Sequence, residues 1–516
     1  MAKTTTEPSI ETEIEKLPRK THRRRSIIQE FGLNTSTHGI PGIARSTSRH
    51  NRIFWSISLL IFIGIMLYFI IKSIIAYFQY PTQTSIDIIV EYPQVFPSVT
   101  ICNYSPYVYY RFIGPFLNYT NSHNLTNTTD TTKFSRQFAS YVPNFLLYNL
   151  QQENSIQNLA YPLETMLMTC NYNDLPCTVA DFISFTSLNY GMCYTFNAQT
   201  ENSTNRSMRY SSDNGGSGRL AMTFYIHRHQ YVPYVTQNVG MMAMIHDNDQ
   251  FPIIAPAGLQ LAPGKNYKMS YKKRTNIFLP APYTSCETKV SLAMQALFDR
   301  YQSINYAYSQ TLCYTLCMQT FVYEKCGCVS PKNWASRSIV FPGTDKIITA
   351  PLCNWTNNCP AQVTVQFSQS GSFRDTKCPN CGPECSTNDF LVKLSSLTTP
   401  VESQFDNIRS FVESTSVPLA ANWSEVWRNE IPMNYISLEV VCESTQTEIL
   451  TQQAAIGAVD VISNVGGQTG LWIGISFLSL FEIIEMLYRL MRSQYHFLRE
   501  KSKKKSKQEH NTDVGP

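Results

Sequence analysis

Two long apolar segments interrupt an otherwise polar chain of 516 residues. The first covers residues 53–71 without charge or proline and continues past Lys72 to Phe78. The second covers residues 465–491 and contains two glutamates. About 20 apolar residues cross the ~30 Å hydrocarbon core of a bilayer, so both segments are long enough to span it. Since 52 polar residues precede the first segment, we expect an uncleaved anchor rather than a signal peptide or a buried core helix.

The polar middle of the chain contains two kinds of pattern. Alternating apolar and polar positions, typical of half-buried strands, occur at 85–90, 99–101, 222–226, 363–367 and 435–441. Weaker helical spacing occurs at 288–301, 306–323 and 402–412. This mixture predicts an α+β domain in which sheets and helices are segregated. Residues 37–46, THGIPGIARS, have no helical pattern and predict irregular backbone before the first span.

The charge at the two ends predicts the orientation in the membrane. Residues 1–52 contain ten Lys or Arg against five Glu, and residues 489–516 contain eight Lys or Arg against three acids. Each tail therefore carries +5, which leaves −5 for residues 53–488 of a chain with a total of +5. Basic flanks stay in the cytoplasm, and two spans place both tails on one side. The sequence therefore predicts cytoplasmic termini and an extracellular or luminal middle.

Cysteines and glycosylation sequons indicate the same topology. All 15 cysteines lie between Cys102 and Cys442, and disulfides need an oxidising compartment. The odd count leaves one thiol over. Asn-x-Ser/Thr sequons, which are glycosylated on the extracellular side, are concentrated in the same segment. They occur at Asn103, Asn118, Asn124, Asn127, Asn202, Asn205, Asn354 and Asn422.

This topology divides the chain into five segments. They are a cytoplasmic tail at 1–52, a first transmembrane helix at 53–79, an extracellular cysteine-rich domain at 80–455, a pre-pore segment and second transmembrane helix at 456–491, and a basic cytoplasmic tail at 492–516. The first tail contains an arginine run at 23–25. The lysine-rich residues 501–507 either bind anionic lipids of the inner leaflet or form a solvated tail that only fixes topology.

Since HExxH, GxSxG and P-loop patterns are all missing from the sequence, we expect no enzyme, and we expect no cofactor and no nucleic-acid partner.

Three longer motifs resemble one known family. FPSVTICN at 96–103 follows the first span, and YSQTLCYTLCMQTFVYEKCGCVSP at 308–331 has the spacing C-x3-C-x8-C-x-C. ISNVGGQTGLWIGISFLSLFEIIE at 462–485 covers much of the second span. GMCYTFN at 191–197 and the pair His38-Gly39 support the same match. Together these motifs resemble the degenerin/epithelial sodium channel family, which includes the acid-sensing channels.

The resemblance implies a trimeric channel of the plasma membrane. Each subunit has two transmembrane helices and a hand-shaped extracellular domain with palm, finger, thumb, knuckle and β-ball parts. The family pattern implies seven disulfides, five of them a ladder in the thumb, and leaves Cys442 as a free thiol. The implied pairs are Cys102–Cys193, Cys170–Cys177, Cys286–Cys385, Cys313–Cys381, Cys317–Cys378, Cys326–Cys359 and Cys328–Cys353. A zinc site at Cys378-x2-Cys381 and Cys326-x-Cys328 is the alternative, but we expect no metal in an oxidising compartment.

Glycines in the second apolar segment indicate a pore. Gly466, Gly467 and Gly470 precede the tripeptide at 474–476. A glycine costs about 1 kcal/mol relative to alanine inside a helix, and it permits a break or a close approach. Irregular backbone at membrane depth can line a water-filled cavity, where its carbonyls replace part of an ion's hydration shell. The expected selectivity filter, at the family's Gly-x-Ser position, is Gly474, Ile475 and Ser476; the alternative is small-residue helix packing.

Two glutamates follow the tripeptide. Glu482 and Glu485 are three residues apart and share one helix face. A carboxylate at membrane depth must face water or a partner, and three chains would form carboxylate rings that attract cations. Alternatively, Glu485 forms an interfacial ion pair with Arg489.

The resemblance implies gating roles for further residues. Ser463 matches the family's degenerin position, where a bulky side chain holds the pore open; alternatively it caps a helix. Gly466 and Gly467 follow it directly, and Gly470 matches a position associated with amiloride block. The pair His38-Gly39 matches a cytoplasmic motif that lines the inner pore.

The region just outside the first span bears on gating. Tyr80 matches an aromatic residue that contacts the base of the thumb in relatives, and Tyr283 stands at the partner position; alternatively both belong to an interfacial aromatic belt. Acid-sensing members carry a histidine pair after the Tyr80 position, where this chain has Pro81-Thr82. Histidine is the natural switch near neutral pH, so this difference argues against proton gating, although carboxylate pairs could also respond.

These observations predict a subunit of a trimeric, sodium-selective, amiloride-sensitive cation channel with Na⁺ as the permeant ion. Its partners are identical or related subunits, the bilayer, and an extracellular ligand such as a neuropeptide or small molecule, unless force opens it. The main alternative is a non-conducting receptor or accessory subunit that needs a related partner. An ATP-gated purinergic-type channel is a further alternative, against which the thumb cysteines and the Gly-x-Ser segment argue.

Overall fold

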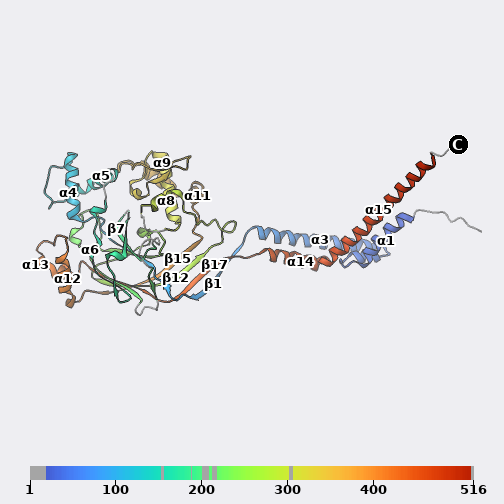
Figure 1. Cartoon of the computed structure of the whole chain (residues 1–516), viewed down its shortest axis with the longest axis horizontal. Helices are drawn as coiled ribbons and strands as arrows, with labels where there is room; N and C mark the ends of the chain where they lie inside the picture. Colours follow the sequence, from blue (N-terminus) through green and yellow to red (C-terminus); the bar gives the residue numbers. More distant parts are fainter. Residues whose placement is uncertain are drawn as a thin grey trace, which may run out of the picture. The chain divides into compact units, whose positions relative to one another are not determined.

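The computed structural model describes residues 19–152, 156–187, 189–199, 208–211, 218–300 and 306–512, and at 19–25 and 504–512 the backbone alone. The chain forms two compact units: Met1–Gln83 with Ala454–Pro516, and Thr84–Gln453. The apolar helices belong to the first unit, and all seven disulfides belong to the second. Figure 1 labels several elements of each.

The first unit contains one continuous apolar helix and one broken one. Helix α3 (Arg49–Phe78) carries the first apolar segment and ends just before Pro81, because a proline disfavours helical backbone in the residue before it. Helices α14 (Ala458–Ile473) and α15 (Phe477–Thr512) carry the second segment and are bent by 70° at their junction. By length and composition, α3 can cross a membrane, and the bent pair is a second candidate span.

Aromatic rings join α3 to α14. Trp472 of α14 stacks on Phe62 and Phe69 of α3, with ring centroids 6.0 and 6.2 Å apart. The indole N–H of Trp472 donates to Gln468, one turn earlier in α14, at 2.7 Å. The two apolar segments therefore pack through large side chains at this level.

The chain before the first span is helical, which corrects the prediction of irregular backbone at 37–46. Helix α1 (Arg19–Asn34) is followed by α2 (Ile40–Arg45). Gly39 turns the chain with a φ of 87°, and Pro41 occupies the first turn of α2. At that position the fixed φ of proline fits a helix and its missing N–H is not needed. The glycine and proline that predicted irregular structure therefore start a helix.

The second unit contains an eight-stranded sheet. Its order is β1-β17-β12-β16-β9-β4-β5, with β15 also paired to β12. Strand β12 (Lys265–Ile277) runs parallel to β16 (Tyr435–Cys442) and β17 (Gln446–Ala454), and antiparallel to β15 (Ser386–Thr398). Alternate residues Tyr267, Met269 and Tyr271 of β12 are buried, as one face of a strand requires. The other strands are β1 (Thr82–Val90), β9 (Arg219–Tyr225), β4 (Leu167–Tyr172) and β5 (Leu175–Pro176).

A second, five-stranded sheet has the order β11-β10-β3-β7-β6. Cys102 and Cys193 face each other across the paired strands β3 and β7 and form a disulfide. The strands are β11 (Leu259–Leu261), β10 (Met241–His246), β3 (Ser98–Asn103), β7 (Gly191–Phe196) and β6 (Phe182–Ser187). Two short pairs join β2 (Gln94–Val95) to β8 (Tyr210–Ser211) and β13 (Ser338–Val340) to β14 (Ile347–Thr349).

The helices of this unit form separate groups, which gives an α+β arrangement. Figure 1 shows α12 and α13 together at one edge, apart from α8, α9 and α11. The longer helices are α4 (Tyr109–Ser122), α5 (Arg136–Gln151), α8 (Leu292–Phe298), α9 (Gln310–Cys326), α10 (Cys359–Gln369), α11 (Gly371–Lys377), α12 (Phe405–Ser414) and α13 (Trp423–Glu430). Helices α6 (Leu163–Met166) and α7 (Ile254–Ala257) are single turns.

One predicted strand, at 363–367, is wrong, because these residues belong to α10. Val363 and Phe367 are both buried and lie four residues apart, on one helical face. Polar and apolar residues alternate in this stretch, so its local sequence has the periodicity of a strand although its backbone is helical. The other four strand predictions overlap β1, β3, β9 and β16, and the three predicted helices overlap α8, α9 and α12.

Candidate ion pathway

The second apolar segment breaks at the predicted filter tripeptide. Gly474 ends α14 with a φ of 69°, and its N–H donates to the Gly470 carbonyl at 3.1 Å. Ser476 precedes α15, and its hydroxyl accepts the Ser479 N–H at 3.3 Å. The Ser476 N–H donates to the Ser479 hydroxyl at 3.1 Å. These contacts satisfy backbone groups that a break in a helix leaves without intrahelical partners.

The predicted pair His38-Gly39 lies at this break. The His38 N–H donates to the carbonyl of Ile473, the last residue of α14, at 2.8 Å. A methyl group at Gly474 would lie 2.8 Å from the His38 ring, closer than a Cβ can approach. Gly39 and His38 also line a cavity of about 730 Å³ that extends to Trp55. The fold therefore brings together two predicted sites from opposite ends of the chain.

Glu482 is bound by the same N-terminal segment. One carboxylate oxygen accepts the Thr35 hydroxyl at 2.9 Å and the Ser36 N–H at 3.0 Å. The Ser36 and Ser479 hydroxyls are 2.5 Å apart. Glu482 thus attaches the chain before α2 to α15. No local pattern in the sequence points to Thr35, Ser36 or Ser479, because a Thr-Ser-Thr run does not indicate a partner far along the chain.

Glu485 and Arg489 form only a loose pair. Their closest atoms are 4.0 Å apart, and the Glu485 side chain is 70% exposed. Arg489 instead donates two hydrogen bonds to Glu30 of α1, at 3.2 and 3.0 Å. The main partner of Arg489 is therefore Glu30, which lies more than 400 positions away and has no local sequence signal.

Ser463 lies inside α14 and does not cap it, which corrects that alternative. The N-cap is Gly457, and its N–H donates to the Asp460 carboxylate at 2.8 Å. Ser463 follows six residues later and is exposed.

The glycines of α14 do not make close contacts within the chain. A methyl group added at Gly466, Gly467 or Gly470 would meet no described atom within 4 Å. The small-residue packing alternative therefore has no support inside a single chain. The 70° bend in this segment falls between α14 and α15, at residues 474–476.

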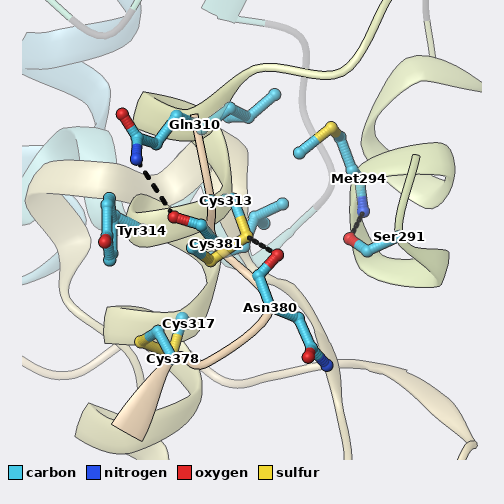
Figure 2. Close-up of a disulfide and its surroundings, with 12 residues drawn as sticks. Ser291, Met294, Gln310, Cys313, Tyr314, Cys317, Cys378, Asn380 and Cys381 are labelled. Carbon is cyan, nitrogen blue, oxygen red and sulfur yellow. Dashed lines mark hydrogen bonds between the residues drawn. A yellow bond between two sulfur atoms is a disulfide. The ribbon is translucent and has the colours of Figure 1, made fainter. Parts of the chain in front are cut away.

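Two disulfides fasten α9 to the segment after α11. They are Cys313–Cys381 and Cys317–Cys378, and both appear in Figure 2. Figure 2 also shows the Gln310 side-chain amide donating to the Cys381 carbonyl, at 3.1 Å. Three more disulfides hold this region: Cys286–Cys385, Cys326–Cys359 and Cys328–Cys353. All four cysteines of the zinc alternative lie in disulfides, which overturns that alternative.

The remaining cysteines complete the pattern that the family resemblance implies. Cys102–Cys193 and Cys170–Cys177 are the other two disulfides. Cys442 is the one cysteine outside a disulfide, and it is fully buried in β16. Its thiol donates to the Ser444 carbonyl at 3.2 Å.

One predicted glycosylation site, Asn103, does not fit the fold. It is 1% exposed, and its amide nitrogen donates to the Ile226 carbonyl at 3.1 Å. Its amide oxygen accepts the Tyr231 hydroxyl at 2.6 Å. A glycan on this nitrogen would have to enter the core, so Asn103 is corrected to a structural residue. Asn118, Asn124, Asn127, Asn354 and Asn422 are exposed, and Asn202 and Asn205 lie outside the described residues.

Tyr80 and Tyr283 belong to different compact units, and the contact between them stays a prediction. Tyr80 adopts a φ of 49° and lies near Tyr77, with ring centroids 6.4 Å apart. The Tyr283 N–H donates to the Pro280 carbonyl at 3.2 Å in a turn.

One carboxyl group of the second unit, that of Asp249, has a raised pKa. Burial, followed by repulsion from Asp247, raises the pKa of Asp249 from 3.8 to about 6. The Asp249 carbonyl accepts the Ala307 N–H at 2.8 Å, which links the end of the five-stranded sheet to the chain before α9. By contrast, burial lowers the pKa of His227 and of His246 to about 4. These two buried histidines are therefore neutral at the pH at which the Asp249 carboxyl changes its charge.

A continuous apolar helix, a second one broken at a capped glycine, and a separate disulfide-bonded domain are the features of a membrane channel subunit. The family model described as "Amiloride-sensitive sodium channel" matches residues 31–486, and this chain belongs to that family. The family consists of cation channels of the plasma membrane, not enzymes, which assemble from identical or related subunits.

Curated relatives cover nearly the whole chain. Acid-sensing ion channel 1A of Danio rerio is 25% identical over 90% of this chain and 88% of its own length. Acid-sensing ion channel 1 of Gallus gallus is 24% identical over 95% and 88%. Degenerin-like protein asic-2 of Caenorhabditis elegans is 23% identical over 89% and 86%.

Proposed function

We propose that this chain is a subunit of a trimeric, sodium-selective, amiloride-sensitive channel, with its filter at Gly474, Ile475 and Ser476. The break between α14 and α15 is the observation that carries this proposal. Backbone that leaves a helix at membrane depth is stable where it faces water, and its carbonyls can coordinate a partly dehydrated cation. Na⁺ is the permeant ion in this proposal.

The N-terminal segment supports the filter from the cytoplasmic side. The hydrogen bond from His38 to Ile473 and the contact of its ring with Gly474 hold the end of α14. The bonds from Thr35 and Ser36 to Glu482 hold the start of α15. Glu482 remains near the break, so three subunits would place three carboxylates around the cation path.

The proposed topology places residues 80–455 outside the cell and both tails in the cytoplasm. Basic tails, cysteines confined to the middle and sequons in the same region support it. The disulfide-bonded α9–α11 region would form a stiff thumb, so an extracellular ligand or force could act on the spans from a distance. A neuropeptide or small molecule fits this arrangement.

Protons are a second candidate stimulus, and Asp249 favours it. Its pKa of about 6 places its charge change within reach of mild acidification. The backbone carbonyl of Asp249 accepts the Ala307 N–H, so the carboxyl lies at a junction of two parts of this unit, and its neutralisation would relieve repulsion from Asp247 there. The acid-sensing names of the relatives agree with this candidate, whereas Pro81-Thr82 argues against it.

The test is voltage clamp of oocytes that express the chain alone. Wild type, Ser463→Phe and the neighbouring control Ile462→Phe are compared at equal surface density, with Na⁺ exchanged for K⁺ and with amiloride. We expect a sodium-selective, amiloride-blocked current from Ser463→Phe only, because a bulky group at 463 keeps the pore mouth from closing. Wild type is then challenged with peptides and with a step to pH 5.

Silence of every variant at normal surface density would reject the homomeric channel. Co-expression with a related subunit would then separate an accessory subunit, which changes the partner's current, from a non-conducting receptor, which leaves it unchanged.

A further inference from the structure

The first tail contains a basic run that the channel proposal does not use. Three arginines at 23–25 stand directly before Ser26, and the apolar residues Ile27 and Ile28 follow. Ser26 lies in α1 and is exposed, whereas Ile27 is buried. An exposed hydroxyl that follows consecutive arginines suits a protein kinase with an acidic substrate groove, because kinases select substrates by charge pattern.

We propose that Ser26 is a phosphorylation site for a basophilic protein kinase that acts on the cytoplasmic tail. The Ser26 hydroxyl oxygen attacks the γ-phosphorus of ATP and forms a new O–P bond. The bond from that phosphorus to the β–γ bridging oxygen breaks, ADP leaves, and the hydroxyl proton passes to the catalytic aspartate of the kinase. This inference rests on the proposed cytoplasmic location of the tail, and not on conduction.

The first turns of α1 can open to enter a kinase groove. The helix begins with Arg19 and Lys20, has no acidic residue in its first turn, and continues into the arginine run. Positive charge at a helix N-terminus opposes the helix dipole. The pairs 19/23 and 20/24 also place like charges four residues apart, which destabilises a helix. The charge pattern therefore lowers the helix stability of this end of α1.

Phosphorylation would act on the contact between α1 and α15. Glu30 lies one turn after Ser26 on the same helix face, and its carboxylate accepts both hydrogen bonds from Arg489. A phosphoserine carries a charge of about −1.5 to −2 at pH 7. It would repel Glu30 and compete with it for Arg489, which lies on the helix that begins at the filter. Modification would thus weaken or replace the ion pair that fixes α1 to α15.

The experiment uses the purified full chain in detergent, a basophilic kinase catalytic subunit, and ATP labelled at the γ-phosphate. Phosphopeptide mapping by mass spectrometry locates the label. We expect close to one phosphate per chain on Ser26, and loss of that label in Ser26→Ala. Arg23→Gln/Arg24→Gln should slow labelling at least tenfold. The matched control Arg49→Gln/Arg52→Gln removes the same charge further along the tail and should leave the rate unchanged.

A label confined to Ser502 or Ser506 in the lysine-rich tail would overturn the proposal, as would a label that survives Ser26→Ala. No label on the intact wild-type chain would overturn it too. The result is independent of the oocyte test. A silent chain that is labelled at Ser26 contradicts only the channel proposal, and a conducting chain that is not labelled contradicts only this one.

Discussion

Gly474 meets two requirements at a single residue. Its φ of 69° lies in the left-handed region that costs other residues energy, and the His38 ring leaves no room for a Cβ. The glycine therefore both ends α14 and admits the N-terminal segment to the break. Gly466, Gly467 and Gly470 meet neither requirement within the chain.

Gly474→Ala should remove at least nine-tenths of the current of the Ser463→Phe background, because a methyl group displaces His38 and strains the backbone. Voltage clamp at matched surface density measures this loss. Gly64→Ala is the control, since a methyl there meets no described atom within 4 Å. An unchanged current in Gly474→Ala would contradict the assigned geometry.

Asp249 makes the stability of the protein depend on pH in a defined direction. Its folded pKa of about 6 exceeds its ordinary value of 3.8, so between these values the folded state binds more protons than the unfolded state. Stability from this group therefore falls as pH rises from about 4 to about 6. Asp249→Asn should flatten the decrease in Tm between pH 4 and 7, as measured by thermal unfolding in detergent.

Asp345→Asn serves as the control for that measurement, because Asp345 is exposed in a turn and should leave the pH profile of wild type unchanged. A profile of Asp249→Asn that is identical to wild type would show that this carboxyl does not carry the raised pKa.

At the scale of elements, the segment at 35–38 connects the ends of α14 and α15. It contributes hydrogen bonds from two backbone N–H groups and two hydroxyls, each to a residue of the second apolar segment. Two of these hydrogen bonds, from the Thr35 hydroxyl and the Ser36 N–H, go to the Glu482 carboxylate, and hydrogen bonds to a charged group are stronger than neutral ones. These hydrogen bonds therefore fix the segment at 35–38 to the end of α14 and the start of α15, and the segment in turn stabilises both helix ends.

Ser36→Cys/Ser479→Cys should form a disulfide upon mild oxidation of the purified protein, because the two hydroxyl oxygens are 2.5 Å apart. The bond is detected because the two tryptic peptides that contain these cysteines stay linked under non-reducing conditions. Thr47→Cys/Ser479→Cys is the matched control, with an exposed residue between α2 and α3, and should remain reduced. Equal cross-linking of both pairs would mean that the tail does not keep this register.

The nested disulfides of the α9–α11 region predict an uneven response to their removal. With Cys317–Cys378 intact, loss of Cys313–Cys381 opens only a short additional loop. The gain in entropy of the unfolded chain should then lower the free energy of unfolding by about 2–3 kcal/mol. Cys313→Ala/Cys381→Ala should therefore lower stability, but the remaining disulfide should still protect Lys377 from trypsin. Removal of both pairs should release the segment and permit rapid cleavage there.

Cys442→Ala should leave trypsin cleavage at Lys377 unchanged, because Cys442 lies outside the disulfides. Rapid cleavage after loss of Cys313–Cys381 alone would show that the second disulfide does not hold this region.

At the scale of the whole molecule, a single chain leaves much apolar surface exposed. Leu60, Ile71 and Leu471 are among many large apolar residues of the candidate spans that are more than half exposed. In the proposed trimer, lipid would cover part of this surface and neighbouring subunits would cover another part. We expect the purified protein to have a mass of three times 58.9 kDa after correction for detergent. Analytical ultracentrifugation checks this, and a monomer or dimer at all concentrations would contradict the trimer.

The sequence by itself determined which segments are apolar enough to span a membrane, which tails are basic, and where the cysteines and the Gly-x-Ser tripeptide stand. These properties are local, because hydropathy, charge and residue type act through the immediate surroundings of each position. Most strands and helices could be predicted in the same way. Residues 363–367 and 37–46 could not, since burial of one face and a turn at Gly39 outweighed their local pattern.

The tertiary structure alone decided which distant residues meet. It joined His38 to Gly474, Thr35 and Ser36 to Glu482, and Glu30 to Arg489. It also buried Asn103 and raised the pKa of Asp249. These contacts link residues that are hundreds of positions apart, and their energies depend on distance and burial. No local pattern of residues encodes either quantity.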